Sequence, residues 1–152
     1  MRSPRTDRES AEQLTRRGLR ATRQRLAVLR LLRGQPGHFT ALDVHRRLLR
    51  RHPTLSQKTV YEILDALVGA GIAARVAHGG GPARYELRRE RHYHARCRVC
   101  GRLEDVPASA DGPIRGHAIV PAGFRIEDIQ VTIEGRCLRC AGRERTKAAR
   151  AG

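Results

Sequence analysis

The sequence predicts an α+β protein built in two parts, and three observations lead to this expectation. Residues 22–87 contain three helices with apolar periodicity, followed by two short alternating runs around a glycine-rich turn. After about residue 90 the pattern changes to alternating strands. All four cysteines of the 152-residue chain lie in this second part, in two Cys-x-x-Cys pairs.

The first two periodic helices are predicted from their end signals. Thr22 is an N-cap for a helix that Gly34 closes. Thr40 starts the next helix and has Asp43 three residues later, the spacing of a capping box. A shorter helix is expected earlier, over about 10–17. The apolar residues expected on the buried side of the helix after Thr40 are Leu42, Val44, Leu48 and Leu49.

The third periodic helix has the clearest pattern and starts at the N-cap Ser56. Its apolar residues recur at helical spacing, and its polar residues lie on the opposite face. The apolar face contains Val60, Ile63, Leu64, Leu67 and Val68, and the polar face contains Gln57, Lys58, Tyr61 and Asp65.

Two alternating runs flank GGGP at 79–82 and predict a β-hairpin. Three helices and a hairpin in this order are typical of a winged helix-turn-helix domain. We expect a disordered N-terminus over 1–9, this domain over 10–88, a small α/β domain over 89–142 and a basic tail over 143–152. In the second domain, strands are expected around HYHARC, GRLEDV and FRIEDIQVTIEG, with a weak helix around SADGPIRGHAIV.

The charge distribution points to a polyanion partner. The net charge is +16, and residues 1–60 hold 15 Lys or Arg against 4 Asp or Glu, whereas residues 61–152 hold 16 against 11. An excess in one half of a chain indicates an anionic partner near that half. No stretch reaches the roughly 18 apolar residues of a membrane helix, and the N-terminus does not resemble a secretory signal. We therefore expect a cytoplasmic protein without a membrane partner.

The two cysteine pairs are Cys97 with Cys100 and Cys137 with Cys140. Each Cys-x-x-Cys turn places two sulfurs within reach of one tetrahedral ion, and Gly101 permits the tight turn of a zinc knuckle. Four thiolates would leave no open position, so the site would hold a structural Zn²⁺. The alternative is a pair of redox dithiols.

His92 and His94 are two residues apart, so on a strand they project to the same face. Glu86 and Asp105 lie on the neighbouring predicted strands. Nitrogen and oxygen donors together suit Fe²⁺, Mn²⁺ or Zn²⁺. The alternative is that both histidines are ordinary surface residues of a strand.

The polar face of the third periodic helix is a candidate for the major groove of DNA. Its side chains Gln57, Lys58 and Tyr61 could reach base edges, thymine methyl groups or phosphates. Arg20 and Arg23, before and at the start of the first periodic helix, are candidate phosphate contacts. The alternative is an ordinary solvated helix face.

Taken together, these stretches resemble the ferric uptake regulator (Fur) family of bacterial metal-dependent repressors. The resemblance covers about residues 12–142. It is carried by the stretches GLRATRQRLAVLRLL, HFTALDVHRRL, KTVYEILDALVGAGI, ARYEL, HYHARCRVCG, GFRIEDIQVTIEGRC and CLRC.

The resemblance implies a homodimer that binds a palindromic double-stranded DNA operator. Each subunit would have an N-terminal DNA-binding domain and a C-terminal dimerisation domain. Cys97, Cys100, Cys137 and Cys140 fall on the family's structural zinc positions, with one Zn²⁺ per subunit. The regulatory metal, Fe²⁺ or Mn²⁺ with Zn²⁺ also possible, would be held by His38, Glu86, His92, His94 and Asp105.

Asp105 and the HYH stretch are similar to the peroxide-sensing, catalase-associated branch of the family (PerR, FurA and CatR). In that branch a ligating histidine, here His38 or His92, is oxidised by peroxide, which releases catalase and other oxidative-stress genes from repression. Glu86 departs from this branch, which usually has Asp at this position. The alternative is therefore an iron- or zinc-responsive uptake repressor. A metal-dependent hydrolase is a further possibility, but the sequence shows no nucleophile or HExxH-type base motif, and we expect no enzyme.

Overall fold

The chain divides into two units, Met1–Arg89 and Glu90–Gly152, next to the division expected after residue 88. The computed structural model describes residues 4–35, 37–76, 81–88, 92–107, 121–125 and 130–142. None of the helices in these ranges is both long and apolar enough to cross a membrane.

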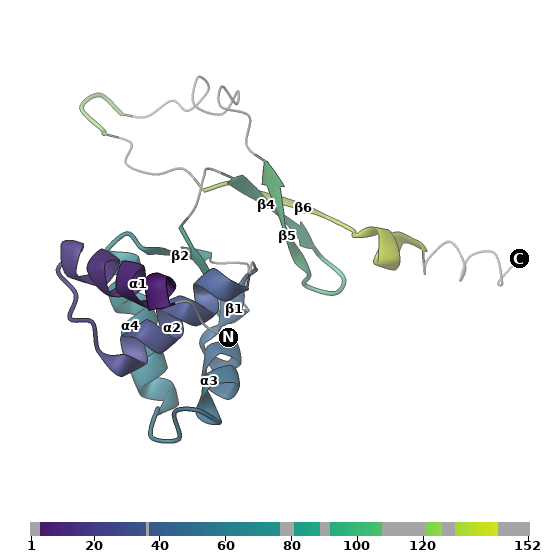
Figure 1. Cartoon of the computed structure of the whole chain (residues 1–152). Helices are drawn as coiled ribbons and strands as arrows, with labels where there is room; N and C mark the ends of the chain where they lie inside the picture. The colour runs from purple at the N-terminus through teal and green to yellow at the C-terminus, as the bar shows by residue number, and fades with distance from the viewer. Residues whose placement is uncertain are drawn as a thin grey trace, which may run out of the picture. The chain divides into compact units, whose positions relative to one another are not determined.

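The first unit contains the helices α1 (Pro4–Arg16), α2 (Arg23–Gly34), α3 (Ala41–Leu49) and α4 (Gln57–Gly69) (Figure 1). The predicted start signals of the last three are confirmed. The side chains of Thr22, Thr40 and Ser56 accept hydrogen bonds from backbone N–H groups at the starts of α2, α3 and α4. At α3 the capping box is complete, because the Asp43 carboxylate also accepts from the backbone N–H of Thr40.

Helix α1 begins six residues before the expected start, so the prediction of disorder over 1–9 is wrong from Pro4 onward. Proline suits the first turn of a helix because its missing N–H has no partner there in any case. Asp7 in the first turn complements the helix dipole and pairs with Arg30 of α2 at 2.7 Å. This contact between helices is not visible as a local pattern, which explains the error.

The strands of the first unit form one sheet in the order β1-β3-β2, with β1 (Phe39–Thr40), β2 (Ala73–Val76) and β3 (Arg84–Leu87). The antiparallel pairing of β2 with β3 confirms the predicted hairpin and the winged helix-turn-helix. The sequence did not predict β1, because two residues are too few to show an alternation.

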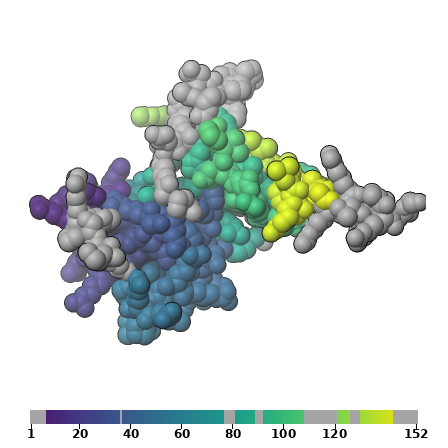
Figure 2. Space-filling model, turned by 45° about the vertical axis from the view of Figure 1, so that its right-hand side comes forward, coloured from purple at the N-terminus to yellow at the C-terminus, as the bar shows by residue number. Residues whose placement is uncertain are grey.

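Leu29, Val44, Leu64 and Tyr85 are among the fully buried side chains that join α2, α3, α4 and β3 in one core. In the space-filling view, the purple and blue atoms of α2 and α3 lie directly against one another (Figure 2). Leu49, which the sequence placed on the buried side of α3, is 42% exposed. It comes one position after Leu48 and therefore turns about 100° away from the core.

The second unit contains a sheet in the order β5-β4-β6, formed by β4 (His92–Cys97), β5 (Leu103–Pro107) and β6 (Thr132–Gly135) (Figure 1). β4 and β5 are the predicted strands on either side of the first cysteine pair. β6 runs parallel to β4, and a short helical segment over 138–142 follows it. The weak helix expected within 109–120, part of the last predicted strand and the tail over 143–152 lie outside the described residues.

Candidate metal centres and nucleic-acid interface

The four cysteines come together in the second unit because β4 and β6 pair in parallel. Cys97 ends β4 opposite Gly135, and Cys137 follows two residues later. Cys100 lies in the turn after β4, where Gly101 adopts φ 68°, a conformation that favours glycine. Cys140 lies in the helical segment that follows Cys137.

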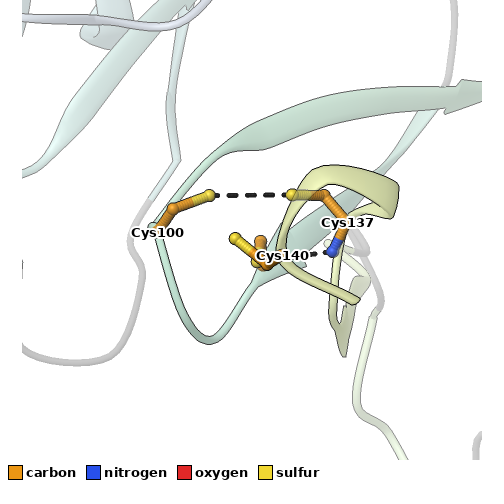
Figure 3. Close-up of side chains that lie close together, drawn as sticks. Cys100, Cys137 and Cys140 are labelled. Atoms are coloured by element: carbon orange, nitrogen blue, oxygen red, sulfur yellow. Dashed lines mark hydrogen bonds between the residues drawn. The ribbon is translucent and has the colours of Figure 1, made fainter. Parts of the chain in front are cut away.

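The four sulfurs lie within 4.8 Å of one another, and all four cysteines are free thiols. Cys100, Cys137 and Cys140 point toward a common centre (Figure 3). Sγ of Cys100 is 3.8 Å from Sγ of Cys137. Four sulfurs at about 2.3 Å from a tetrahedral Zn²⁺ are about 3.8 Å apart, so this spacing fits zinc.

The surroundings of the cluster lower the pKa of the Cys97 thiol and raise that of the Cys140 thiol. Backbone N–H groups, first that of Cys137 and then that of Cys100, lower the pKa of Cys97 to about 6. Hydrogen bonding to the Cys137 and Cys100 side chains raises the pKa of Cys140 to about 12. Four adjacent thiolates repel one another, and a divalent cation would remove this repulsion.

The first unit brings His38 and Glu86 together. His38 directly precedes β1 and Glu86 lies on β3, so the register that pairs Phe39 with Tyr85 sets His38 opposite Glu86. Nε2 of His38 lies 2.8 Å from Oε2 of Glu86. Two ligands at about 2.1 Å from one ion lie about 3 Å apart when they subtend a right angle. The pair therefore has the spacing of two neighbouring metal ligands, but two donors do not complete a coordination shell.

The second unit brings His92, His94 and Asp105 together on β4 and β5. The rings of His92 and His94 meet edge to face, with their centroids 4.8 Å apart. Asp105 lies directly opposite His94 in the strand register, and its Oδ1 is 3.8 Å from Nε2 of His92. The two histidines thus lie on one face of the sheet, as the spacing predicted, beside a carboxylate. They supply the nitrogen and oxygen donors that Fe²⁺, Mn²⁺ or Zn²⁺ can accept.

The candidate DNA-contacting side chains all lie in the first unit and are exposed. Gln57, Lys58 and Tyr61 lie on the outer face of α4, and Tyr61 is 41% exposed. Arg20 and Arg23 precede and begin α2. The guanidinium of Arg25 donates to the carbonyl of Arg20 at 3.1 Å and thereby holds the connection before α2 in place.

Two side chains that hold α4 in position were not predicted from the sequence. Nε2 of His45 on α3 donates to the carbonyl of Leu55 at 2.9 Å and so fixes the turn between α3 and α4. Tyr85 Oη on β3 donates to Oδ1 of Asp65 on α4 at 3.2 Å. Burial raises the pKa of Tyr85, and the charge of Asp65 raises it further. Their partners lie 10 and 20 residues away, so no local pattern shows these bonds.

Comparison with known proteins identifies the family. The profile described as "Ferric uptake regulator family" matches residues 16–134. The chain is 30% identical over 136 residues to the "Peroxide operon regulator" of Bacillus subtilis, covering 90% of this chain and 94% of that protein. It is 40% identical over 116 residues to "Ferric uptake regulation protein 1" of Mycolicibacterium fortuitum, covering 75% and 71%.

A solved structure described as "Zinc Uptake Regulator Complexed With Zinc AND DNA" is 26% identical, with a TM-score of 0.65 over 95% of this chain and 99% of that one. Together, the match over most of the chain and the shared fold show that this protein belongs to the ferric uptake regulator family of metal-dependent transcriptional regulators, and not to the metal-dependent hydrolases.

Proposed function

We propose that the protein is a cytoplasmic repressor whose homodimer binds a palindromic operator when a regulatory ion is bound, and that it senses peroxide. The observation that carries the proposal is the pairing of His38, directly before β1, with Glu86 on β3. β1 leads into α3, the first helix of the helix-turn-helix, and β3 is a strand of the wing. An ion held there acts on the backbone that positions the DNA-reading helix.

The structural ion is Zn²⁺, held by Cys97, Cys100, Cys137 and Cys140, with one site per subunit. Four sulfurs with tetrahedral spacing support this assignment. The ion would join the end of β4 to the segment after β6. It leaves no open coordination position, so its role is to stabilise the second unit.

The regulatory ion takes ligands from both units: His38 and Glu86 from the first, and His92, His94 and Asp105 from the second. The first set offers only two donors, and together the two sets give three nitrogens and two carboxylates, which suits Fe²⁺ or Mn²⁺ and also accepts Zn²⁺. Shared ligands tie the equilibrium between arrangements of the two units to the occupancy of the ion. A preference of about 3 kcal/mol for the DNA-binding arrangement shifts that equilibrium about a hundredfold.

DNA is contacted by the outer face of α4, through Gln57, Lys58 and Tyr61, with Arg20 and Arg23 on the phosphates. The exposure of these side chains and the basic first unit support this assignment. The similar zinc uptake regulator described with zinc and DNA supports the same partner. Two copies would place two such helices on the two halves of a palindrome.

Peroxide sensing follows from histidine ligands on a redox-active ion. Fe²⁺ bound by these residues would supply the redox chemistry that cleaves the O–O bond of H₂O₂. In the net reaction, a ring C–H of His38 or His92 gains one oxygen atom from the peroxide, the other oxygen leaves as water, and the imidazole supplies the two electrons. The oxidised ring binds the ion poorly, so repression of catalase-type genes ends.

The second candidate is an iron- or zinc-responsive uptake repressor. Glu86 favours it, because the extra methylene compared with Asp changes the reach of the carboxylate and with it the geometry at the ion. Such a repressor would respond to the concentration of the metal and not to peroxide.

The test is to load the protein with Fe²⁺ or Mn²⁺, treat it with H₂O₂, and measure both operator binding and peptide masses. The Fe²⁺ form is expected to lose DNA binding and to gain about 16 Da, one oxygen atom, on a peptide that contains His38 or His92. The Mn²⁺ form should keep both its mass and its DNA binding. Peroxide-insensitive DNA binding by the Fe²⁺ form would select the uptake repressor, and a mass gain confined to cysteine peptides would select the alternative of two redox dithiols.

A further inference from the structure

We propose that Tyr85 is a positioning residue that couples metal binding at the His38–Glu86 pair to the position of α4, the helix proposed to read DNA. The inference rests on the proposed function, since it concerns how an ion at that pair alters DNA binding. It depends only on contacts inside the first unit.

Strand β3 separates the ligand pair from the helical core. Successive residues of a strand project to opposite faces, so Tyr85 and Glu86 point in opposite directions. Tyr85 is 1% exposed and belongs to the core with α2, α3 and α4. Glu86, on the other face, meets His38 at 2.8 Å. A shift of the β3 backbone at Glu86 toward an ion would therefore also move Tyr85, the adjacent residue of the strand.

The phenol of Tyr85 contacts the face of α4 that reads DNA. Its Oη donates to Oδ1 of Asp65 at 3.2 Å. Asp65 lies four residues after Tyr61 and seven after Lys58, so the three form one row along the helix. The bond thus anchors to β3 the same row of α4 that carries proposed DNA contacts.

The other ligand of the pair leads directly to α3. His38 is two residues before Thr40, the N-cap of α3, and its carbonyl accepts a hydrogen bond from Nη1 of Arg84 at 3.3 Å. The two ligands are therefore each close to one helix of the helix-turn-helix. The connection to α3 is covalent, whereas the connection to α4 passes through the side chain of Tyr85. Tyr85 is for this reason the residue whose alteration can uncouple α4 without removing a ligand.

The experiment measures the ratio of the DNA Kd without metal to the DNA Kd with saturating Mn²⁺. The probe is a duplex operator selected with the Mn²⁺-loaded wild-type protein from a random pool. For the wild type the expected ratio is about a hundredfold. Tyr85→Phe keeps the buried ring and removes only the hydroxyl, and it is expected to lower the ratio about threefold to tenfold. The Mn²⁺ Kd of the DNA-free protein, measured by electron paramagnetic resonance, should change less than about twofold, because no ligand is altered.

Variants of Asp65 test the partner of the bond. Asp65→Ala should lower the ratio as much as Tyr85→Phe does, and the double variant should lose no more than either single one. Asp65→Asn keeps an acceptor oxygen and should retain most of the wild-type ratio. Both Asp65 variants lose a negative charge, which would strengthen DNA binding equally with and without metal. This effect therefore cancels in the ratio of the two Kd values.

Ser10→Ala is the matched control. It removes a hydroxyl on α1 that accepts a hydrogen bond from Arg33 of α2 at 3.0 Å, and it should leave the ratio unchanged.

A wild-type ratio in Tyr85→Phe, or additive losses in the double variant, would overturn the inference. An equal weakening of DNA binding with and without metal would also overturn it, because that is the result of a structural role alone. If the wild type itself shows no metal-dependent binding, the proposed function fails instead.

Discussion

At the scale of single residues, the cysteine cluster shows how backbone N–H groups lower the pKa of a candidate metal-binding thiol. Cys97 is buried at the end of β4, and the N–H of Cys137 points at its sulfur at 3.4 Å. This donor comes from the second cysteine pair, so the largest contribution to the low pKa of Cys97 arises only when the two pairs are together. Zn²⁺ binds the thiolate form, so folding of the second unit and zinc binding should support each other.

Replacing Cys97 with serine tests this link. Cys97→Ser keeps the size of the side chain but removes the thiolate, and the zinc content of the purified protein is expected to fall from about one ion per chain to near zero. Elemental analysis measures the zinc, and a thermal scan should show earlier unfolding. Val99→Ala, at a 59% exposed position between the first two cysteines, is the control and should keep the zinc. Full zinc content in the serine variant would exclude the four-cysteine site.

At the scale of elements, the start of α3 joins a candidate ligand to the helix-turn-helix. The side chain of Thr40 accepts from the N–H of Asp43, and the carboxylate of Asp43 accepts from both the N–H and the hydroxyl of Thr40. These bonds, first that from the Thr40 side chain, lower the pKa of Asp43. The capping box therefore fixes where α3 begins, at Ala41, three residues after His38.

The capping box predicts a pH-dependent contribution to stability. Thr40→Ala should lower the free energy of unfolding by about 1 kcal/mol at neutral pH. The lowered pKa of Asp43 means that its contribution is present above its unfolded pKa, about 3.9, and is lost as pH falls through the lower folded value. Urea unfolding of wild type and Asp43→Ala should therefore show a difference near pH 7 that shrinks below about pH 4. A difference that grows as pH falls would contradict this assignment.

At the scale of the whole molecule, the proposal is that one ion uses ligands from both units. All four cysteines lie in the second unit, whereas the proposed regulatory ligands are divided between the units. Loss of a first-unit ligand should therefore abolish the metal response without affecting the zinc. This separation distinguishes the proposed bridging ion from an ion held by the second unit alone.

His38→Ala tests the bridging ion. The variant should keep its zinc and its metal-free DNA affinity but lose most of the roughly hundredfold gain in DNA affinity that Mn²⁺ gives. Fluorescence anisotropy with the selected operator measures the gain. His52→Ala is the matched control, since it removes a histidine of the same unit that has no proposed ligand role. A full Mn²⁺ response in His38→Ala would exclude a ligand from the first unit.

Local signals in the sequence were sufficient for much of the fold. N-cap residues and apolar periodicity correctly placed α2, α3 and α4, and the alternation around GGGP predicted the hairpin. These features depend on residues within four or five positions of each other, so a linear pattern contains them. The spacing of His92 and His94 likewise placed both on one face of β4. The grouping of His38 with Glu86 came only from the family resemblance, because 48 positions separate them.

By itself, the sequence determined which residue types can bind metal and which helix has an exposed polar face. Only the tertiary structure decided that α1 starts at Pro4, that β1 pairs with β3 to set His38 opposite Glu86, and that Tyr85 reaches Asp65. The physical reason is that these features depend on contacts between elements distant in the chain. Asp7 stabilises α1 partly through Arg30 of α2, and two residues of β1 form a strand only because β3 lies beside them.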